Sequence, residues 1–365
     1  MRVLVLGGTG AMGNPLVNLL GECDDVYVTS RKKREDHGNI HFIQGDAHDL
    51  SFIQQELSKN YDAIIDFMIY STEDFNGRSK LYLKSTGQYM FLSSARVYAD
   101  SSEPITENSP RLLDVCNDAD YLKTDEYALA KARSENVLLD SGKKNWTIIR
   151  PYITYNTQRL QLGGLELETW LTSVLAGRPL ALPQDVGVHE TTMTYGEDVA
   201  KVMVALIGNP NAYGEAFHIT GSDHMKWNDI AEVYRDVIEE QTGNRPDLYT
   251  PETSSQLSAI MGNTFQIKYD RTYNRVFNNT KLQKACGEKL NFTSMNEGLR
   301  LCLKNYLSLP AKSRKEKHNI RYTAWLDKSM KKIPSLKNLN GTKEKFKYLG
   351  YYYVPGIISL IRKMR

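Results

Sequence analysis

Residues 1–20 have the sequence MRVLVLGGTGAMGNPLVNLL. A short apolar run from Val3 to Leu6 leads into closely spaced glycines, and the segment from Asn14 to Leu20 carries apolar residues at helical spacing. An apolar run, a glycine turn and an amphipathic segment in direct succession predict a strand, a tight turn and a helix. This stretch therefore predicts the first βα unit of an α/β fold.

The same alternation continues along the first half of the chain. Short apolar or β-branched runs predict strands at 26–29, 41–44, 63–68, 89–92 and 146–150. Segments with helical spacing lie among them at 51–58 and 121–139. Such alternation is typical of parallel βαβ units. We expect an α/β fold: a Rossmann-type doubly wound parallel sheet, a smaller mixed α/β C-terminal substrate lobe and a basic C-terminal extension. The expected boundaries are 1–155 for the sheet domain, with parts of 195–225 returning to it, 156–309 for the lobe and 310–365 for the extension.

Charge is distributed unevenly along the chain. Residues 310–365 hold 15 Lys and Arg against 3 Asp and Glu, which is +12. Subtracting these from the totals of 46 and 43 leaves 31 basic and 40 acidic residues, which is −9, in residues 1–309. The overall charge of +3 does not indicate a nucleic-acid partner, and we expect none.

The cysteines and the N-terminus bear on the compartment. The four cysteines have neither Cys-x-x-Cys spacing nor a histidine at metal-ligand spacing, so we expect no disulfide framework and no metal site. Free thiols favour the reducing cytoplasm. The first apolar run is too short for a signal peptide, and no stretch approaches the length of a transmembrane helix. We therefore expect a cytoplasmic protein.

The N-terminal glycines predict a phosphate site. Gly7, Gly10 and Gly13 have the spacing Gly-x-x-Gly-x-x-Gly at the first βα junction. Glycines let the backbone approach a pyrophosphate, and the N-terminus of the following helix supplies unpaired N–H groups. We predict dinucleotide binding here; a purely structural glycine turn is the alternative.

The second expected strand bears on which dinucleotide is bound. An NAD site usually has an acidic residue about 20 residues downstream of the glycines, whereas an Arg accommodates the 2′-phosphate of NADP. Here the sequence Thr29-Ser30-Arg31-Lys32-Lys33 contains no carboxylate, and Arg31 can bind a phosphate bidentately. The sequence therefore favours NADP(H) as the cofactor, with NAD(H) as the alternative. If these basic residues bind no cofactor, they form a solvated surface loop.

Tyr127 and Lys131 stand four residues apart in the expected helix at 121–139, which places both side chains on one face. They form the only Tyr-x-x-x-Lys sequence in the chain. The preceding strand ends at Ser94, so all three groups are expected at the carboxyl edge of the sheet. A phenol with the ordinary pKa of about 10 is a weak base at neutral pH, but a nearby ammonium stabilises the phenolate. The set favours proton transfer accompanying hydride transfer, with Ser94 steadying the reacting oxygen.

Further motifs occur in a fixed order: Gly45-Asp46, Ser93-Ser94-Ala95-Arg96-Val97-Tyr98, Tyr127 with Lys131, Arg150-Pro151 and Gly214-Glu215-Ala216-Phe217-His218-Ile219-Thr220. Together with the glycine loop, they resemble an extended short-chain dehydrogenase/reductase of the nucleotide-sugar epimerase/dehydratase family over residues 1–305. The resemblance implies an NAD(P)-dependent enzyme of polysaccharide biosynthesis that acts on a nucleotide-linked sugar.

The resemblance also implies roles for individual residues. The implied catalytic residues are Ser94, Tyr127 and Lys131. The implied cofactor-binding residues are Gly7, Thr9, Gly10, Ala11, Met12, Gly13, Arg31, Asp46, Ala47, Phe67, Met68, Ser93, Lys131, Pro151 and Ile153. The implied substrate-binding residues are Ser94, Arg96, Tyr127 and Arg159. We also expect a homodimer.

Departures from the family pattern narrow the expected reaction. The chain has Ser94-Ala95-Arg96 where the 4,6-dehydratases carry Thr-Asp-Glu, so the acid and base that eliminate water are missing. Asp66-Phe67-Met68 replaces the common Ala-Ala after the fourth strand, and Ile153 replaces an Asn. We expect a 4-epimerase or a 4-ketoreductase. The alternatives are a catalytically silent NADP(H)-binding regulatory or scaffold module, and an atypical reductase of a non-sugar metabolite.

The C-terminal segment 348–365 mixes aromatic and aliphatic residues with three terminal cations. This composition is typical of an interfacial segment on anionic lipid, which would place the protein peripherally at a membrane. An arm that packs on the body or on a second subunit is the favoured alternative, because such a surface would carry the complementary acidic charge.

Overall fold

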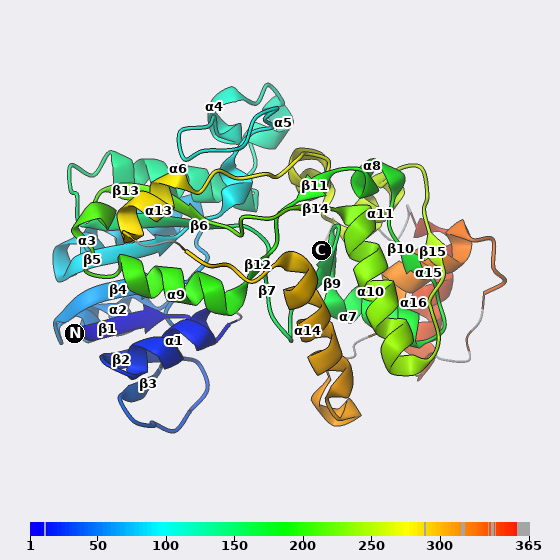
Figure 1. The fold of residues 1–365 in the computed structure, drawn as a ribbon, viewed down its shortest axis with the longest axis horizontal. Helices are drawn as coiled ribbons and strands as arrows, with labels where there is room; N and C mark the ends of the chain where they lie inside the picture. Colours follow the sequence, from blue (N-terminus) through cyan, green and yellow to red (C-terminus); the bar gives the residue numbers. More distant parts are fainter. Residues whose placement is uncertain are drawn as a thin grey trace. The chain divides into compact units, whose positions relative to one another are not determined.

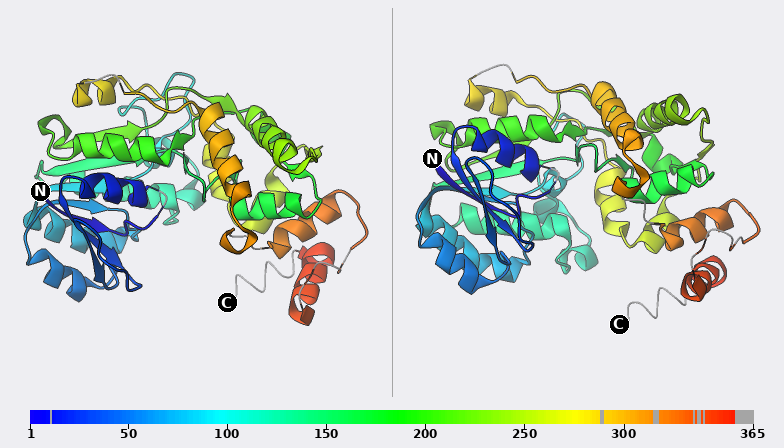
Figure 2. Two further views of the ribbon diagram at one scale, coloured as in Figure 1. Left: turned by 60° about the horizontal axis from the view of Figure 1, so that its bottom comes forward. Right: turned by 90° about the horizontal axis from the view of Figure 1, so that it is seen from below.

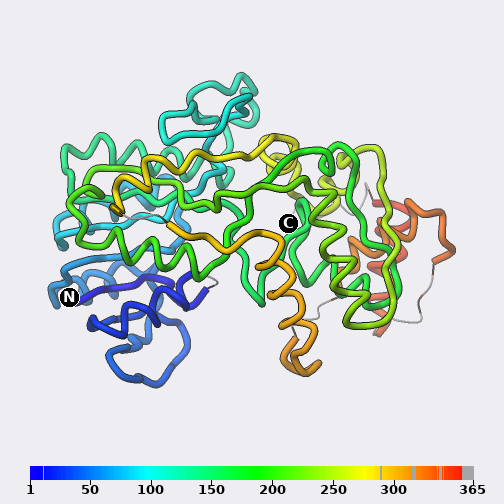
Figure 3. The backbone as a smooth tube through the Cα atoms, in the orientation of Figure 1, coloured from blue at the N-terminus to red at the C-terminus, as the bar shows by residue number. Residues whose placement is uncertain are grey.

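The computed structural model describes residues 1–10, 12–287, 290–314, 318–334, 336, 339 and 341–355. The chain forms two compact units. The first comprises Met1–Asn156, Thr192–His224 and Arg275–Gly298, and the second comprises Thr157–Thr191, Met225–Asn274 and Leu299–Arg365. The chain therefore passes repeatedly from one unit to the other, as can be followed in Figure 3.

The described part of the first unit contains a seven-stranded parallel sheet with the strand order β13-β6-β5-β4-β1-β2-β3. The order reverses at β1, so the sheet is doubly wound, and a ligand is expected at the carboxyl ends of the strands beside this reversal. The predicted fold class is confirmed (Figure 1). The strands are β1 Arg2–Leu6, β2 Asp25–Ser30, β3 Ile40–Gln44, β4 Tyr61–Asp66, β5 Thr86–Leu92, β6 Trp146–Pro151 and β13 Glu215–Ile219.

Helices cover both faces of this sheet. Alternate residues of β1 enter two different apolar clusters, because successive side chains of a strand point to opposite faces. One cluster includes α1 (Gly13–Gly21) and α9 (Gly196–Leu206). The other includes α2 (Leu50–Leu57), α3 (Thr72–Ser85) and α6 (Tyr127–Leu139). Burial on both faces explains why the strands have almost continuous apolar runs.

Short elements complete the first unit. They are η1 (Ala95–Val97), α4 (Leu112–Val115), α5 (Ala119–Leu122), η2 (Pro210–Ala212), α13 (Thr280–Cys286) and the parallel pair β7 (Thr154–Tyr155) and β12 (Thr194–Tyr195). Helix α14 (Met295–Ser308) begins in this unit and ends in the second.

The second unit is mainly helical. Its core includes Trp170 of α7 stacked on Tyr234 of α10, with ring centroids 4.7 Å apart. Its helices are α7 (Leu167–Leu175), α8 (Gln184–Gly187), α10 (Trp227–Thr242), α11 (Ser255–Met261), α12 (Thr264–Gln266), the π-helical turn η3 (Ile267–Arg271), η4 (Ala311–Ser313), α15 (Ile320–Ser329) and α16 (Gly341–Tyr353). Its short strand pairs are β8 (Gln161–Leu162) with β9 (Leu165–Glu166), β10 (Leu180–Ala181) with β15 (Leu248–Tyr249), and β11 (Glu190–Thr191) with β14 (Met225–Lys226).

Helices α15 and α16 come from the basic C-terminal segment and pack against each other (Figure 2). None of the helices in the described part of the chain combines the length and the apolarity needed to cross a bilayer.

Candidate active site

The glycine loop between β1 and α1 has the form of a phosphate cradle. Gly7 has a φ of 72°, which favours glycine, and its N–H donates to Thr29 Oγ1 at 3.1 Å. A Cβ on Gly13 would lie 2.5 Å from the carbonyl of Gly8, so the helix can start this close to the strand only with glycine. No described atom lies within 4 Å of a Cβ built on Gly10, which leaves open space in front of the loop.

The N-terminus of α1 faces this loop without a side-chain cap. Met12 occupies the N-cap position and forms no capping hydrogen bond. The first N–H groups of a helix have no partner within the helix and attract anions. Thr9 is half-buried in the loop, and Ala11 lies outside the described residues. In α1, Asn14 N donates to Gly10 O at 3.0 Å and Pro15 has no N–H, so the helix supplies few N–H donors. The open space at Gly10 is therefore the feature that best fits a dinucleotide pyrophosphate.

The structure brings Arg31 and Asp46 to adjacent positions. Gly45 N donates to Ser30 O at 3.0 Å, which joins the carboxyl ends of β2 and β3 directly before these two residues. Both side chains are exposed, and Asp46 Oδ1 accepts from His48 N at 3.0 Å. Ala47 is buried beside them. Arg31 is thus placed at the end of β2, where the sequence predicts contact with a 2′-phosphate.

Lys131 is buried at the other end of the candidate site, with 4% of its surface exposed. Its Nζ donates to Leu92 O at 2.6 Å and to Met68 O at 3.2 Å. Burial lowers the pKa of Lys131 to about 8, against the opposing effect of Asp66 and Glu135. An ammonium has three donors, so one N–H remains for a ligand hydroxyl after the two described bonds.

Phe67 and Met68 form the turn that follows β4. Phe67 N donates to Leu6 O at 3.0 Å, which aligns the ends of β4 and β1, and both side chains are half-buried. Met68 Sδ lies 2.9 Å from the position of a Cβ on Gly7, so this turn borders the glycine loop. The predicted cofactor residues of the two turns therefore lie together.

Asp66, the last residue of β4, is fully buried and was not among the predicted site residues. It accepts hydrogen bonds from Tyr89 Oη at 2.7 Å, from Met68 N at 2.9 Å and from Tyr70 Oη at 3.4 Å. Burial raises the pKa of Asp66, and these donors and the charge of Lys131 oppose the rise. Asp66 thus holds the turn whose Met68 carbonyl accepts from Lys131. The only indication of this role in the sequence is that Asp66 stands where the family pattern has a small residue.

Tyr127 is the first residue of α6 and lies close to two cations. The Arg96 guanidinium is 5.4 Å from the centroid of its ring, and Lys131 Nζ is 5.9 Å from the same centroid. A positive charge near a phenol favours its phenolate form, and of these two cations Lys131 has no carboxylate of a described residue in direct contact, whereas Arg96 is paired with Glu126. Arg96 also forms an ion pair with Glu126 at 2.6 Å, and Glu126 caps α6 by accepting from Ala128 N at 2.8 Å.

Ser94 caps the short helix η1 that carries Arg96. It is 7% exposed, and its Oγ accepts from Arg96 N at 3.2 Å. The Ser94 hydroxyl donates to no described residue, so its proton is available for a ligand oxygen. The Arg96–Glu126 ion pair joins the Ser94 turn to the start of α6, so it links the segments that carry Ser94 and Tyr127.

A buried ionic network fixes α6 on the sheet. Glu135 is fully buried and accepts from Ser93 Oγ at 2.6 Å. Arg150 binds both oxygens of Glu135 at 2.8 Å and donates to Tyr98 Oη at 2.9 Å. Glu135 also pairs with Arg111 at 3.2 Å. Ser93, which the sequence predicts to bind the cofactor, therefore has a positioning contact within the protein. The sequence signal for Glu135 is its spacing of four residues from Lys131, which puts both on one face of the helix.

Pro151 ends β6, and the following turn contains an unusual backbone conformation. Ile153 has a φ of 35° and is buried. A β-branched residue at positive φ is strained, and such strain is frequent at functional sites. Arg159 belongs to the second unit and pairs there with Glu166 at 3.6 Å. Its predicted substrate contact stays a prediction.

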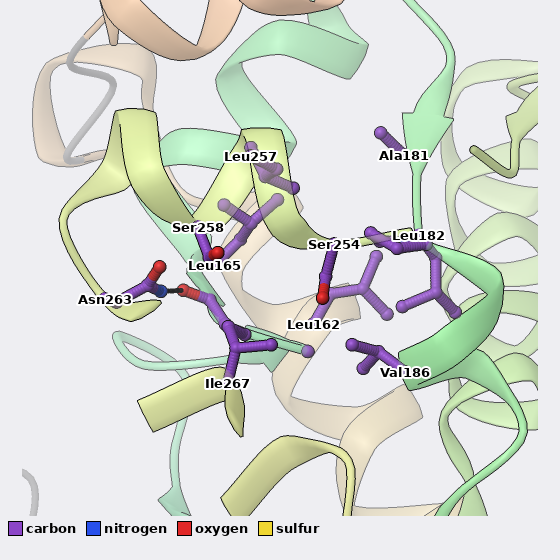
Figure 4. A pocket seen from close by; sticks show the side chains of 13 residues that line it. Leu162, Leu165, Ala181, Leu182, Val186, Ser254, Leu257, Ser258, Asn263 and Ile267 are labelled. Carbon is purple, nitrogen blue, oxygen red and sulfur yellow. Dashed lines mark hydrogen bonds between the residues drawn. The ribbon is translucent and has the colours of Figure 1, made fainter. Parts of the chain in front are cut away.

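The second unit also contains an apolar cavity lined by Leu162, Leu182, Val186 and Ile267, among others (Figure 4). It leaves about 10 Å³ for the centre of a water molecule, which is too small for a sugar nucleotide. The described residues include no group of three or more His, Cys, Asp or Glu side chains that could hold a metal ion.

Comparison with known proteins places this geometry in context. The model of the NAD dependent epimerase/dehydratase family matches residues 3–220. The chain is similar in fold to dTDP-glucose 4,6-dehydratase from Bacillus anthracis in complex with NAD, with a TM-score of 0.65, 16% identity, and coverage of 86% of this chain and 99% of that one. It is likewise similar in fold to UDP-glucuronic acid 4-epimerase from Bacillus cereus in complex with UDP-glucuronic acid and NAD, with a TM-score of 0.61, 17% identity, and coverage of 84% of this chain and 99% of that one.

A curated relative is the chloroplast stem-loop binding protein of 41 kDa b from Arabidopsis thaliana. It is 26% identical over 256 residues, which are 64% of this chain and 62% of the relative. The chain thus spans less than two thirds of the length of this relative.

Proposed function

The chain belongs to the NAD-dependent epimerase/dehydratase family, and we propose that it oxidises or reduces C4 of a nucleotide-linked sugar as a 4-epimerase or a 4-ketoreductase. The observation that carries this proposal is that two cations, Arg96 and buried Lys131, lie within 6 Å of the ring centroid of Tyr127. A binding module has no need of a phenol prepared for proton transfer.

The residues have distinct roles in this mechanism. Tyr127 Oη takes the proton of the sugar hydroxyl in the oxidation direction and returns it in the reduction direction. Ser94 Oγ donates a hydrogen bond to the same oxygen, and Lys131 binds the ribose of the dinucleotide through its remaining N–H. When bound, the dinucleotide supplies the nicotinamide that accepts or returns the hydride. The charge of Lys131 stabilises the phenolate that the transfer requires, and Arg96 adds a smaller contribution because Glu126 compensates most of its charge.

The environment of Arg96 supports a reaction without loss of water. Elimination needs an additional acid and base beside the reacting carbon, and the corresponding positions here hold Ala95 and Arg96. The Arg96 guanidinium pairs with Glu126, so this carboxylate is neutralised by its own ion pair. Neither Ala95 nor Arg96 is suited to the extra proton transfers of a dehydratase.

The central experiment measures turnover on a panel of UDP-, GDP-, CDP- and dTDP-sugars with their 4-keto forms. We expect Tyr127→Phe to keep the fold and to lower kcat by about 100-fold to 10,000-fold, the usual effect of losing a general acid–base group. Full activity of Tyr127→Phe would exclude the mechanism. Absence of turnover on the whole panel, with dinucleotide binding intact, would favour a silent binding module; turnover on a non-sugar carbonyl would favour the atypical reductase.

Native mass spectrometry separates the two proposed reactions. An epimerase regenerates its dinucleotide in each turnover and retains it, so the purified protein should carry one bound dinucleotide. A ketoreductase must exchange it, so the protein should be empty and should need added NADPH. The masses of retained NAD and NADP also differ by one phosphate, which identifies the natural cofactor directly.

We further propose NADP(H) as the cofactor, on the basis of Arg31 at the end of β2 and the absence of a carboxylate from that turn. The solved relatives named above contain NAD, so the test must compare both. We expect Arg31→Ala to weaken NADP binding by about tenfold or more through loss of a charge-assisted phosphate contact, with NAD binding unchanged. Equal effects on both dinucleotides would exclude a contact between Arg31 and the 2′-phosphate, and tighter binding of NAD than of NADP to the unmodified protein would favour NAD as the cofactor.

A second candidate function follows from the curated relative, whose name describes stem-loop binding. Our prediction from the sequence is that nucleic acid is not a partner, and a gel-shift assay with an RNA hairpin tests this directly. Binding that falls steeply with added salt would support RNA recognition through phosphate contacts.

A further inference from the structure

The C-terminal helix α16 is anchored to the second unit by one face. Tyr348 is fully buried on this face, and its Oη donates to Asp327 of α15 at 2.9 Å. The same carboxylate binds Nε and Nη2 of Arg178, both at 3.1 Å. Ala324, Leu339 and Tyr348 form a small apolar cluster between the helices. The orientation of α16 is therefore determined, and its opposite face is directed away from this packing.

That opposite face exposes large apolar side chains. Phe346 is 70% exposed and Tyr353 is 62% exposed. They are seven residues apart, so they lie on the same side of the helix. Val354, directly after the helix, is 44% exposed, and Ile333, which follows α15, is 89% exposed. Phe346, Tyr353 and Val354 are thus exposed large apolar residues of one helix and its end, a concentration that normally marks an interaction surface.

Lysines flank this apolar face. Lys343, Lys345 and Lys347 are all exposed, and none of them takes part in an ion pair with a described residue. Lys331 and Lys332 are exposed beside Ile333. An apolar stripe flanked by unpaired lysines on an amphipathic helix is the pattern of a helix that lies in the headgroup region of an anionic membrane.

A polar cavity adjoins the same helix. Its volume is about 380 Å³, and Lys347 and Tyr351 of α16 line it with His318 and Arg321 at the start of α15; Glu168 contributes one opposing charge. Because Lys347 precedes Tyr351 by one helical turn and follows Phe346 directly, the cavity lies beside the exposed apolar stripe. Its two permanent cations suit the phosphate of a lipid headgroup.

We propose that the exposed face of α16, with Phe346, Tyr353 and Val354 at its centre and Lys343, Lys345 and Lys347 at its edges, binds the surface of an anionic phospholipid membrane. The sequence that follows α16, GIISLIRKMR at residues 356–365, contains five large apolar and three basic residues. The net charge of +12 over 310–365 provides the long-range attraction. The exposed aliphatic side chain of Val354 beside the aromatic Phe346 and Tyr353 favours insertion into lipid, and the RNA arm of the test below separates this from stacking of the aromatic rings on bases.

The test is co-sedimentation of the full-length protein with vesicles. We expect binding to vesicles of three parts phosphatidylcholine to one part phosphatidylglycerol, weak binding to phosphatidylcholine alone, and a loss of affinity with added salt. Phe346→Ser with Tyr353→Ser should lower the affinity at least about tenfold, because each side chain loses its burial in the interface. Lys343→Glu with Lys345→Glu should do the same for anionic vesicles only.

Matched controls are available elsewhere on the surface. Leu301→Ser removes an apolar residue that is 49% exposed on α14, and Lys123→Glu reverses a lysine side chain that is 76% exposed. Both control variants should bind vesicles as the unmodified protein does. Circular dichroism melting checks that the α16 variants remain folded.

Four outcomes would overturn the proposal: no binding to anionic vesicles, equal losses for the control and the α16 variants, loss of binding only on removal of 356–365, or dissociation of a dimer by the α16 variants in the absence of vesicle binding. Binding of an RNA hairpin that depends on these lysines, without vesicle binding, would assign the surface to nucleic acid.

Discussion

The buried ammonium of Lys131 should leave a measurable imprint on the pH dependence of folding stability. The pKa of Lys131 is about 8 in the folded protein and about 10.4 in an unfolded chain. Below pH 8 both states carry the proton, so the full cost of burying the charge is present. Above pH 8 the folded state releases the proton while the unfolded state keeps it, and stability rises with pH until the unfolded group titrates.

The size of this effect follows from the same two values. Between pH 7 and 9, a group with a folded pKa of about 8 adds about 1.4 kcal/mol to the free energy of unfolding. Lys131→Met removes the titrating group while keeping an unbranched side chain. The lost hydrogen bonds to Leu92 and Met68 lower its stability by an amount that does not depend on pH over this range.

The assay is urea unfolding of both proteins at pH 7, 8 and 9 without added dinucleotide. The stability of the unmodified protein relative to Lys131→Met should increase by about 1.4 kcal/mol across the series. The exposed Lys123→Met variant should run parallel to the unmodified protein. Parallel curves for Lys131→Met would refute the reasoning, since they would mean that the ammonium is solvated or paired as in the unfolded chain.

Three further predictions test other parts of the structure. Ile153→Gly should be about 1 kcal/mol more stable than Ile153→Ala, because both variants remove the side chain but only glycine accepts the φ of 35° without strain; thermal melts that rank alanine equal or higher would contradict the backbone assignment. Burial lowers the pKa of His218 to about 4, so on acidification the folded state keeps the imidazole neutral while the unfolded state takes up a proton. The free energy of unfolding of the unmodified protein should therefore fall by about 2 kcal/mol relative to that of His218→Gln between pH 7.5 and 5. A difference between the two proteins that stays constant in denaturant unfolding would count against this. Gly10→Ala should fold with unchanged stability yet bind dinucleotide weakly, whereas Gly13→Ala should be destabilised by its contact with Gly8; calorimetric titration and melting of both variants would expose the error if their behaviour were reversed.

The fold was predictable because it depends on local patterns. The strand runs, the glycine turn and the helix with Tyr127 and Lys131 each have a signature within a few residues, and parallel alternation then fixes the sheet class. The adjacency of Arg31 and Asp46 follows from that topology alone. The C-terminal segment was less predictable: its lysine-rich composition obscured α15 and α16, whose packing depends on the distant partner Arg178.

The buried polar groups of the site were less accessible to sequence analysis. Asp66 and Glu135 look like ordinary surface residues until their partners are known, because an acidic residue is buried only where donors from other segments satisfy it. Those donors come from as far away as Arg150 for Glu135 and Tyr89 for Asp66. The backbone of Ile153 is similarly set by its surroundings, since its own side chain disfavours that conformation.

The Arg96–Glu126 ion pair also constrains how this protein can evolve. A single change of Arg96 to Glu, toward the pattern of the dehydratases, would place a second carboxylate against Glu126, where the two groups now meet at 2.6 Å. It would at the same time remove a cation from the face of Tyr127. Like charges at that separation are unfavourable, and the phenolate would lose support. Under the proposed mechanism, a change toward the dehydratase sequence therefore requires at least two coordinated substitutions, one at Arg96 and one at Glu126.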